Sequence, residues 1–152
     1  MLRETPGRVL LSPLALGSIA LIVGNDLWLK RQHPGFLSGK LSDVGLCILL
    51  PLVIAAAIEW TQALLRRPLA PHATFACLLA ATYFVLVKTY APATHAHLAL
   101  LSHLVPTHRF SAVTDPSDLL ALPFMWLAYR AQRATKRLEK APKATARQSF
   151  AR

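Results

Sequence analysis

Apolar residues gather into four blocks that short polar segments separate. The blocks run from Val9 to Trp28, from Val44 to Trp60, from Ala73 to Val87 and from Leu119 to Tyr129. A bilayer core of roughly 30 Å needs about 20 helical residues, with a tolerance of a few; the first three blocks match or approach that length, and the fourth is the shortest. The pattern therefore predicts an all-α integral membrane protein, a four-helix bundle in which each block is one span.

The segment between the third and fourth blocks has a different pattern. From Thr94 to Val113 the apolar runs are short, and four histidines interrupt them. Runs of this length are more often interfacial or re-entrant than spanning. We expect this segment to lie on the membrane or dip into it. The four histidines are His95, His97, His103 and His108.

Composition supports the membrane prediction. The chain has 152 residues, of which 54% are hydrophobic and 16% charged, and its mean hydropathy is +0.40. This is too apolar for an ordinary soluble domain. We expect residues 1–140 to form one four-span transmembrane domain, and residues 141–152 to form a basic, disordered cytoplasmic tail.

Basic residues predict the orientation. If both termini are cytoplasmic, the inner side carries Arg3, Arg8, Arg66-Arg67 and the eight Lys and Arg from Arg130 onwards. This agrees with the positive-inside rule. A removable signal peptide is the alternative for the first block, but Asn25-Asp26 follows its charge-free part, Val9 to Gly24, where small residues would mark a cleavage site, so we expect it to be retained. The outer side then holds Lys30, Arg31, Lys40, Lys88 and Arg109.

Four clusters of polar and ionisable residues mark the outer ends of the four predicted spans. Charges at such margins are costly unless they pair or face a wet cavity. Spacings of three or four residues place Asp26 with Lys30, and Lys40 with Asp43, on one helix face, and neighbouring helix ends meet in an up-down bundle. The predicted ligand-binding residues are Asn25, Asp26, Lys30, Lys40, Ser42, Asp43, Lys88, Asp115 and Asp118.

Helix capping is the alternative reading of the fourth cluster. Asp115-Pro116-Ser117-Asp118 has an N-cap residue, a proline at the first helical position and an acid in the first turn. Cap and site both stay open for Asp115 and Asp118. Ser38 or Ser42 could cap the second helix in the same way.

The remaining charges are harder to explain as caps. Lys88 could extend its amine to the interface. Asp26 lies at a helix C-terminus, which disfavours a carboxylate, so it needs a cation. Lys30 is the local candidate, and Lys40 or Lys88 the tertiary ones. We therefore expect Asp26→Asn to lower function or folding yield more than Glu59→Gln.

Other chemistries lack a sequence signature. The histidines do not show a known metal-ligand spacing, so we expect no metal. Ser42-Asp43 and Ser102-His103 lack the surroundings of a nucleophile, and no catalytic residue is assigned. Glycine-rich phosphate loops and dinucleotide motifs are missing, and no cofactor is predicted. We expect Cys47 and Cys77 to be reduced, because the topology separates them by roughly 20 Å in depth.

The net charge of +10 comes mostly from the tail. A basic run beside a span binds anionic lipid head groups, at about 1 kcal/mol per residue. No nucleic-acid motif accompanies it, so lipids rather than nucleic acid are the predicted partners. A protein partner or a homo-oligomer stays open.

Three motifs carry a family resemblance. Asn25-Asp26-Leu27-Trp28-Leu29-Lys30, the Gly39-Lys40-Leu41-Ser42-Asp43 element and Asp115-Pro116-Ser117-Asp118-Leu119 together resemble a group of small, uncharacterised bacterial multi-pass membrane proteins. The resemblance covers roughly Asn25 to Tyr129 and implies a bacterial inner-membrane location, without a mechanism. Size and the polar residues near span ends also resemble VanZ-like proteins, but the Glu-Gln and Asn-Gly elements of that family are missing.

Three function classes follow from these observations. In the first, the outer pocket binds or transports a polar ligand, an ion or a lipid head group. In the second, the chain is an enzyme acting on an outer-leaflet lipid or cell-envelope precursor, with Asp26 or Asp43 as base and Lys40 or Lys88 stabilising negative charge. In the third, it is a structural subunit of a membrane complex. Binding is preferred, because no single catalytic group stands out.

Overall fold

The computed structural model describes residues 5–33, 35–68, 72–106 and 114–136, and within these ranges the regular structure is entirely helical. The predicted all-α class is confirmed. The elements are η1 (Arg8–Leu11), α1 (Pro13–Gly24), η2 (Asn25–Leu29), α2 (Lys30–Gln32), α3 (Phe36–Leu64), α4 (Ala73–Thr89), α5 (Ala91–Leu104) and η3 (Pro116–Phe124). Helical backbone continues from η3 over residues 125–136, called the terminal helix below. The predicted tail, 141–152, lies outside the described residues.

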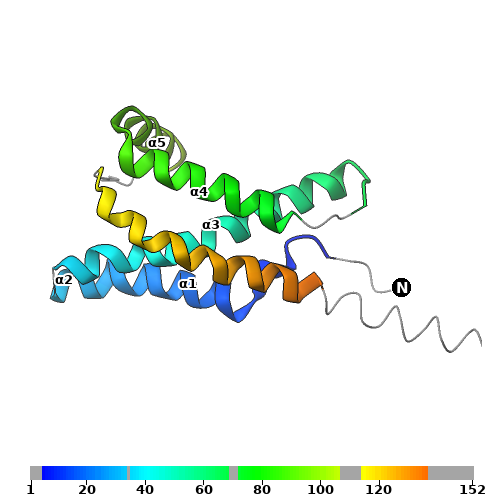
Figure 1. The fold of residues 1–152 in the computed structure, drawn as a ribbon, viewed down its shortest axis with the longest axis horizontal. Helices are drawn as coiled ribbons and strands as arrows, with labels where there is room; N and C mark the ends of the chain where they lie inside the picture. Colours follow the sequence, from blue (N-terminus) through cyan, green and yellow to red (C-terminus); the bar gives the residue numbers. More distant parts are fainter. Residues whose placement is uncertain (1–4, 34, 69–71, 107–113, 137–152) are drawn as a thin grey trace, which may run out of the picture.

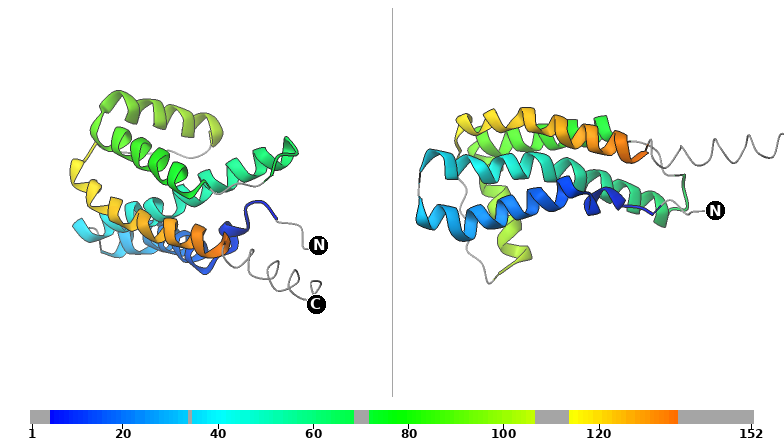
Figure 2. Two further views of the ribbon diagram at one scale, coloured as in Figure 1. Left: turned by 45° about the vertical axis from the view of Figure 1, so that its right-hand side comes forward. Right: turned by 90° about the horizontal axis from the view of Figure 1, so that it is seen from below.

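Helix α3 is the central element of the bundle. It packs against α1, α4 and η3 (Figures 1 and 2). The molecule is elongated, with two ends that carry different elements. We call the end with α2, the junction of α4 and α5, and the start of η3 the elbow end. The opposite, tail end carries η1, the end of α3, the start of α4 and the end of the terminal helix.

Small residues make up much of the interior, next to a few large ones such as Leu52 and Phe84, and many large apolar residues lie on the outside. Leu11, Leu64 and Leu120 are 76%, 80% and 71% exposed. A soluble helical domain would bury such side chains, whereas membrane helices pack through small residues and turn large ones to lipid. This distribution is typical of a lipid-facing bundle. The buried small residues include Ala15, Ser18, Ala55, Ala56, Ala76, Ala80, Ala121 and Ala128.

Gly45 allows the closest approach of α1 and α3. A Cβ atom at this position would lie 2.6 Å from Cγ1 of Ile22 and 3.1 Å from the backbone oxygen of Ser18. Both distances are shorter than ordinary van der Waals contacts. The glycine therefore sets the separation of the two helices near the elbow end.

We expect Gly45→Ala to destabilise the chain by about 1–3 kcal/mol, because the added methyl group would push α1 from α3. Thermal unfolding in detergent measures the change. Gly39→Ala is the matched control: Gly39 is in the same helix, and no atom outside its own stretch of helix lies within 4 Å of the place that a Cβ atom would take there. That control should be neutral or slightly stabilising. Equal stability of both variants would contradict close packing at Gly45.

The second helix begins earlier than its apolar block predicts. Gly35 is the N-cap of α3, and Ser38 Oγ accepts a hydrogen bond from the Gly35 N–H at 3.0 Å. The predicted capping role of Ser42 is therefore wrong, and Ser38 acts from the first turn rather than from the cap position. The helix begins before its apolar stretch because the polar residues of its first turns, Lys40, Ser42 and Asp43, have partners on neighbouring helices. Lys40 and Asp43 consequently lie within α3, not before it.

Pro51 lies in the middle of α3 and is buried. A proline has no backbone N–H, so one hydrogen bond of the helical ladder is missing there. The helix continues on both sides of it.

Helices α4 and α5 meet at an angle of 107° at the elbow end. The side chain of Thr94 is buried at the junction, where its Oγ1 donates a hydrogen bond to the carbonyl oxygen of Val87 at 2.6 Å. This bond satisfies a carbonyl at the end of α4. Residues 94–104 of the segment expected to be interfacial or re-entrant therefore belong to α5, a helix that turns sharply away from α4, and residues 107–113 lie outside the described part.

By length and composition, one described helix, Ser38–Leu64, could span a bilayer by itself. The bent pair of α4 and α5 would count as a second if it is one broken span. The first predicted span corresponds to a rod of residues 13–32 that contains the π-helical turn η2, and the last starts with the 3-10 turns of η3. Four membrane spans therefore stay a prediction.

Candidate functional site

Five of the predicted site residues lie together at the elbow end. Lys88 Nζ lies 2.9 Å from Asp43 Oδ1 and 2.6 Å from Asp118 Oδ2. Asp118 also forms an ion pair with Lys40, and Lys40 Nζ lies 3.0 Å from Asp115 Oδ2. Asp118 thus joins both lysines. We call this set, with Ser117, the Asp118 network: Lys40, Asp43, Lys88, Asp115, Ser117 and Asp118.

Three elements supply the network. Lys40 and Asp43 are three residues apart on α3 and share a face, as predicted. Lys88 is in the last turn of α4, and Asp118 is in the first turn of η3. The predicted convergence of the second, third and fourth clusters is confirmed by these contacts. Lys88 bonds to carboxylates here instead of extending its amine outwards.

Asp115 is a helix cap, as predicted, and also the ion-pair partner of Lys40. It is the N-cap of η3, and its Oδ1 accepts a hydrogen bond from the Ser117 N–H at 2.9 Å. Its other oxygen accepts from Lys40. Pro116 occupies the first turn as expected. Asp118 is not the cap, and its side chain is only 9% exposed.

The surroundings of Asp115 lower the pKa of its carboxyl group from 3.8 to about 2. The causes, in order, are the hydrogen bond from the Ser117 hydroxyl, the bond from the Lys40 amine and the bond from the Ser117 N–H. These donors favour the charged form of the carboxyl group. The group is therefore ionised throughout the physiological pH range.

We expect this lowered pKa to make acid destabilise the elbow end. The unfolded state binds a proton near pH 3.8 and the folded state only near pH 2, so stability is complete above about pH 4 and falls as pH falls through about 2. Unfolding of the wild type and Asp115→Asn between pH 7 and 2 measures the contribution. Asparagine can still cap the helix, and its variant should lack this component of the pH dependence.

The other four predicted residues form a second group between η2 and α3. Asn25 Nδ2 donates to the Ser38 carbonyl and to Ser42 Oγ, both at 2.7 Å. Ser42 Oγ donates to Asp26 Oδ1 at 2.6 Å. Lys30 Nζ lies 2.6 Å from the same carboxylate oxygen, so the local cation is the ion-pair partner of Asp26. We call Asn25, Asp26, Lys30 and Ser42 the Asp26 chain.

The backbone at Asn25–Leu29 is a π-helix. The Lys30 N–H bonds to the Asn25 carbonyl, which is the five-residue spacing of this helix type. Such turns are rare and are frequently found at functional sites. Here the turn buries Asn25 while Asp26 stays exposed. The side-chain oxygen of Asn25 is buried and accepts no hydrogen bond from the described residues.

The two groups differ in burial. The side chains of Lys88 and Asp43 are 14% and 13% exposed, whereas those of Lys30 and Asp26 are 42% and 46% exposed. Ion pairs in partly desolvated surroundings are costly to break, and exposed pairs contribute little. The Asp118 network is therefore the energetically important part of the site.

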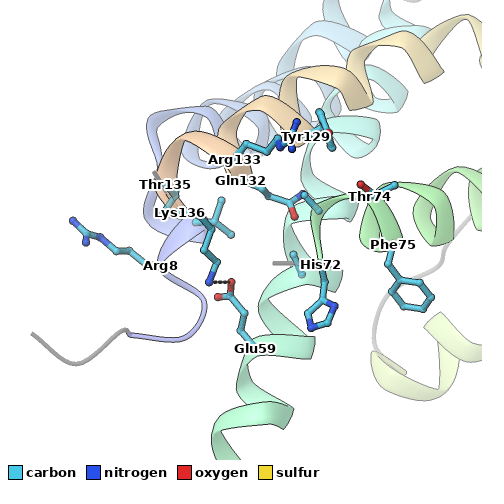
Figure 3. A pocket seen from close by; sticks show the side chains of 13 residues that line it. Arg8, Glu59, His72, Thr74, Phe75, Tyr129, Gln132, Arg133, Thr135 and Lys136 are labelled. Atoms are coloured by element: carbon cyan, nitrogen blue, oxygen red, sulfur yellow. Dashed lines mark ion pairs between the residues drawn. The ribbon is translucent and has the colours of Figure 1, made fainter. Parts of the chain in front are cut away.

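A second polar site, which the sequence did not predict, lies at the tail end. Glu59 Oε1 is 2.9 Å from Lys136 Nζ, and Glu59 Oε2 accepts a hydrogen bond from the Gly7 N–H at 2.9 Å. The pair borders a cavity of about 500 Å³ (Figure 3). Glu59 is the acid that interrupts the second apolar block, and that signal could have indicated the site.

Glu59 is therefore not a neutral reference for Asp26. Its side chain is 12% exposed and has two partners, whereas Asp26 is close to half-exposed. The structure gives the opposite expectation for folding yield: Glu59→Gln should lower it more than Asp26→Asn.

Among the described histidines, His97 of α5 contacts α4. His97 Nδ1 and the Tyr83 hydroxyl form a hydrogen bond, with their rings edge to face. Among the described residues, no group of three or more His, Cys, Asp or Glu side chains could hold a metal ion. His108 lies outside these residues. Cys47 and Cys77 are free thiols.

Comparisons with protein-family models, with curated proteins and with solved structures found no match for this chain. The resemblance of its three motifs to small bacterial membrane proteins therefore stays a prediction.

Proposed function

We propose that this chain is a four-span protein of the bacterial inner membrane, with both termini in the cytoplasm and the elbow end outside. Two observations support this placement. Many large apolar side chains face outwards, while small residues make up much of the interior. The elbow end carries the aspartates, whereas Arg8, Arg66, Arg67 and Lys136 belong to the tail end, in agreement with the positive-inside rule.

The elbow end is the binding site in this proposal. It binds a polar ligand, an ion or a lipid head group that presents positive charge or hydrogen-bond donors. The observation that carries this choice is the excess of acid: the Asp118 network has three aspartates and two lysines. The buried Asn25 oxygen supplies a further acceptor nearby. A cation or a donor group would complete both sets of contacts.

Binding is favoured over catalysis because no aspartate of the network is left without a lysine partner. Each aspartate of the network pairs with a lysine, and Asp118 pairs with two. A general base would instead need a carboxylate with access to a substrate proton. An incoming cation can share these carboxylates without any proton transfer.

Thermal unfolding of the purified protein in detergent tests the ligand proposal. The probes are sodium, potassium and magnesium chlorides at constant ionic strength, and mixed micelles with phosphatidylethanolamine or phosphatidylglycerol. At least one cationic probe or phosphatidylethanolamine should raise the midpoint of the wild type, because a ligand that binds only the folded state stabilises it. Asp43→Asn should abolish the increase. Arg67→Gln, which removes a charge at the tail end and lies outside both the Asp118 network and the cavity beside Glu59, should keep it.

Four results would contradict the proposal. The first is a midpoint that neither the cations nor phosphatidylethanolamine raises, and the second is an increase that Asp43→Asn retains in full. Turnover of an outer-leaflet lipid or a cell-envelope precursor by the purified protein would make it an enzyme. A membrane protein that co-purifies in equal amount would make it a subunit.

Accessibility labelling tests the orientation independently. In a variant without Cys47 and Cys77, single cysteines at Arg31 and Arg67 should react with an impermeant maleimide from opposite sides of the membrane. Both positions are exposed, and they lie towards opposite ends of the bundle. Labelling of both from one side would contradict the four-span arrangement.

A further inference from the structure

The cavity at the tail end is separate from the Asp118 network. It has a volume of about 500 Å³, within the roughly 300–1,000 Å³ of typical ligand pockets. Residues of η1, the end of α3, the start of α4 and the terminal helix line it. Figure 3 shows these segments around the labelled side chains. We call it the Gln132 cavity.

Gln132 gives the cavity a buried hydrogen-bond donor. The residue is 7% exposed and lines the cavity from the terminal helix (Figure 3). Its Nε2 is buried and donates no hydrogen bond to the described residues. A buried amide without a partner costs about 1–3 kcal/mol. A ligand oxygen in the cavity would accept this hydrogen bond.

The charges around the cavity favour an anion. Glu59, the acid in its lining, is bound by Lys136 and by the Gly7 N–H. Arg8 and Arg133 also line the cavity and are exposed, so they lie at its solvent side. The guanidinium of Arg133 lies 5.2 Å from the centre of the Tyr129 ring. The two arginines leave an excess of positive charge in the cavity lining, with the Arg8 side chain directed outwards in Figure 3.

Part of the cavity lining is apolar. Val9 and Ala55 line it and are each 5% exposed, and Ala73 lines it at the start of α4. The cavity therefore offers cationic and amide donors together with hydrocarbon surface. A ligand with a charged head and an attached apolar part would match both.

We propose that the Gln132 cavity binds a phosphate-bearing anion, with Gln132 donating from within and Arg8 and Arg133 contacting it from the rim. Guanidinium groups match the geometry of phosphate oxygens and form two bonds at once. The phosphate comes either from a phospholipid head group or from a free phosphate in solution. This site does not depend on a ligand at the elbow end.

Binding of three probes to the detergent-purified, full-length chain tests the inference. Native mass spectrometry and thermal unfolding are measured with phosphatidylglycerol, with phosphatidylcholine and with inorganic phosphate. Gln132→Leu removes the donor without leaving a buried polar group, so it should fold at least as well as the wild type. Arg133→Gln removes one rim charge. Each variant should weaken binding at least about tenfold, the effect of one lost bond to a charged group.

Arg67→Gln is the matched control, because it makes the same change near the same end and Arg67 does not line the cavity. It should bind like the wild type. If phosphatidylglycerol binds the wild type and Gln132→Leu weakens that binding, the ligand is a lipid head group. If inorganic phosphate behaves in this way, the ligand is a free phosphate. Unchanged binding in Gln132→Leu, equal loss in Arg67→Gln, or no binding of any probe would overturn the proposal.

Discussion

Replacing Asp118 by asparagine is expected to destabilise the chain by about 3–5 kcal/mol, the cost of removing one partner from a buried ion pair. Asp118 is the carboxylate that both Lys40 and Lys88 contact, and its side chain is 9% exposed. Without its charge the two lysines share only Asp43 and Asp115 within the network. Thermal unfolding in detergent and the yield of folded protein from membranes measure the loss.

Asp26→Asn is the control for that experiment. It makes the same chemical change at the same end, but the Asp26–Lys30 pair is close to half-exposed on both sides. Its loss should be at most about 1 kcal/mol, because water screens exposed pairs. If the two variants lose equal stability, the Asp118 network does not have the importance that its burial indicates.

Replacing Lys88 by methionine is expected to have the second largest effect, again about 3–5 kcal/mol. Methionine keeps much of the length of the side chain but removes the cation that pairs with Asp43. Asp118 would still be held by Lys40. The uncompensated charge is therefore at Asp43, which is buried in α3.

A second change should restore much of this loss. Adding Asp43→Asn to Lys88→Met removes the uncompensated carboxylate, and replacing a whole buried pair by neutral groups is often nearly neutral. The double variant should therefore be more stable than Lys88→Met alone. A double-mutant cycle on the two positions measures the coupling. Additive losses would show that Lys88 and Asp43 do not interact in the folded protein.

Helical spacing was enough to predict which charges of the Asp118 network share a face. Lys40 and Asp43 are three residues apart, and both bond to residues of other helices. The prediction that the clusters meet at one end required only helices of alternating direction. The composition and the lengths of the apolar blocks were also enough to predict the all-α class.

The choice of partners could not be predicted, because it depends on how the helices rotate about their axes. Asp26 bonds to Lys30 and Ser42 instead of Lys40 or Lys88, since the π-helical turn directs Asn25 inwards and leaves Asp26 near the surface. The start of α3 was missed because Gly35 and Ser38 form a cap before the apolar block begins. The Gln132 cavity depends on residues of four segments, and one sequence does not show that they meet.

Helix α3 is held on two faces at the elbow end. Lys40 and Asp43 form ion pairs with η3 and α4, and Ser42 accepts a hydrogen bond from Asn25 of η2. Pro51, further along, interrupts the ladder of backbone bonds. Bending of α3 should therefore concentrate at Pro51 and move Glu59 relative to the elbow end. Such bending would change the width of the Gln132 cavity and leave the ion pairs of the Asp118 network intact.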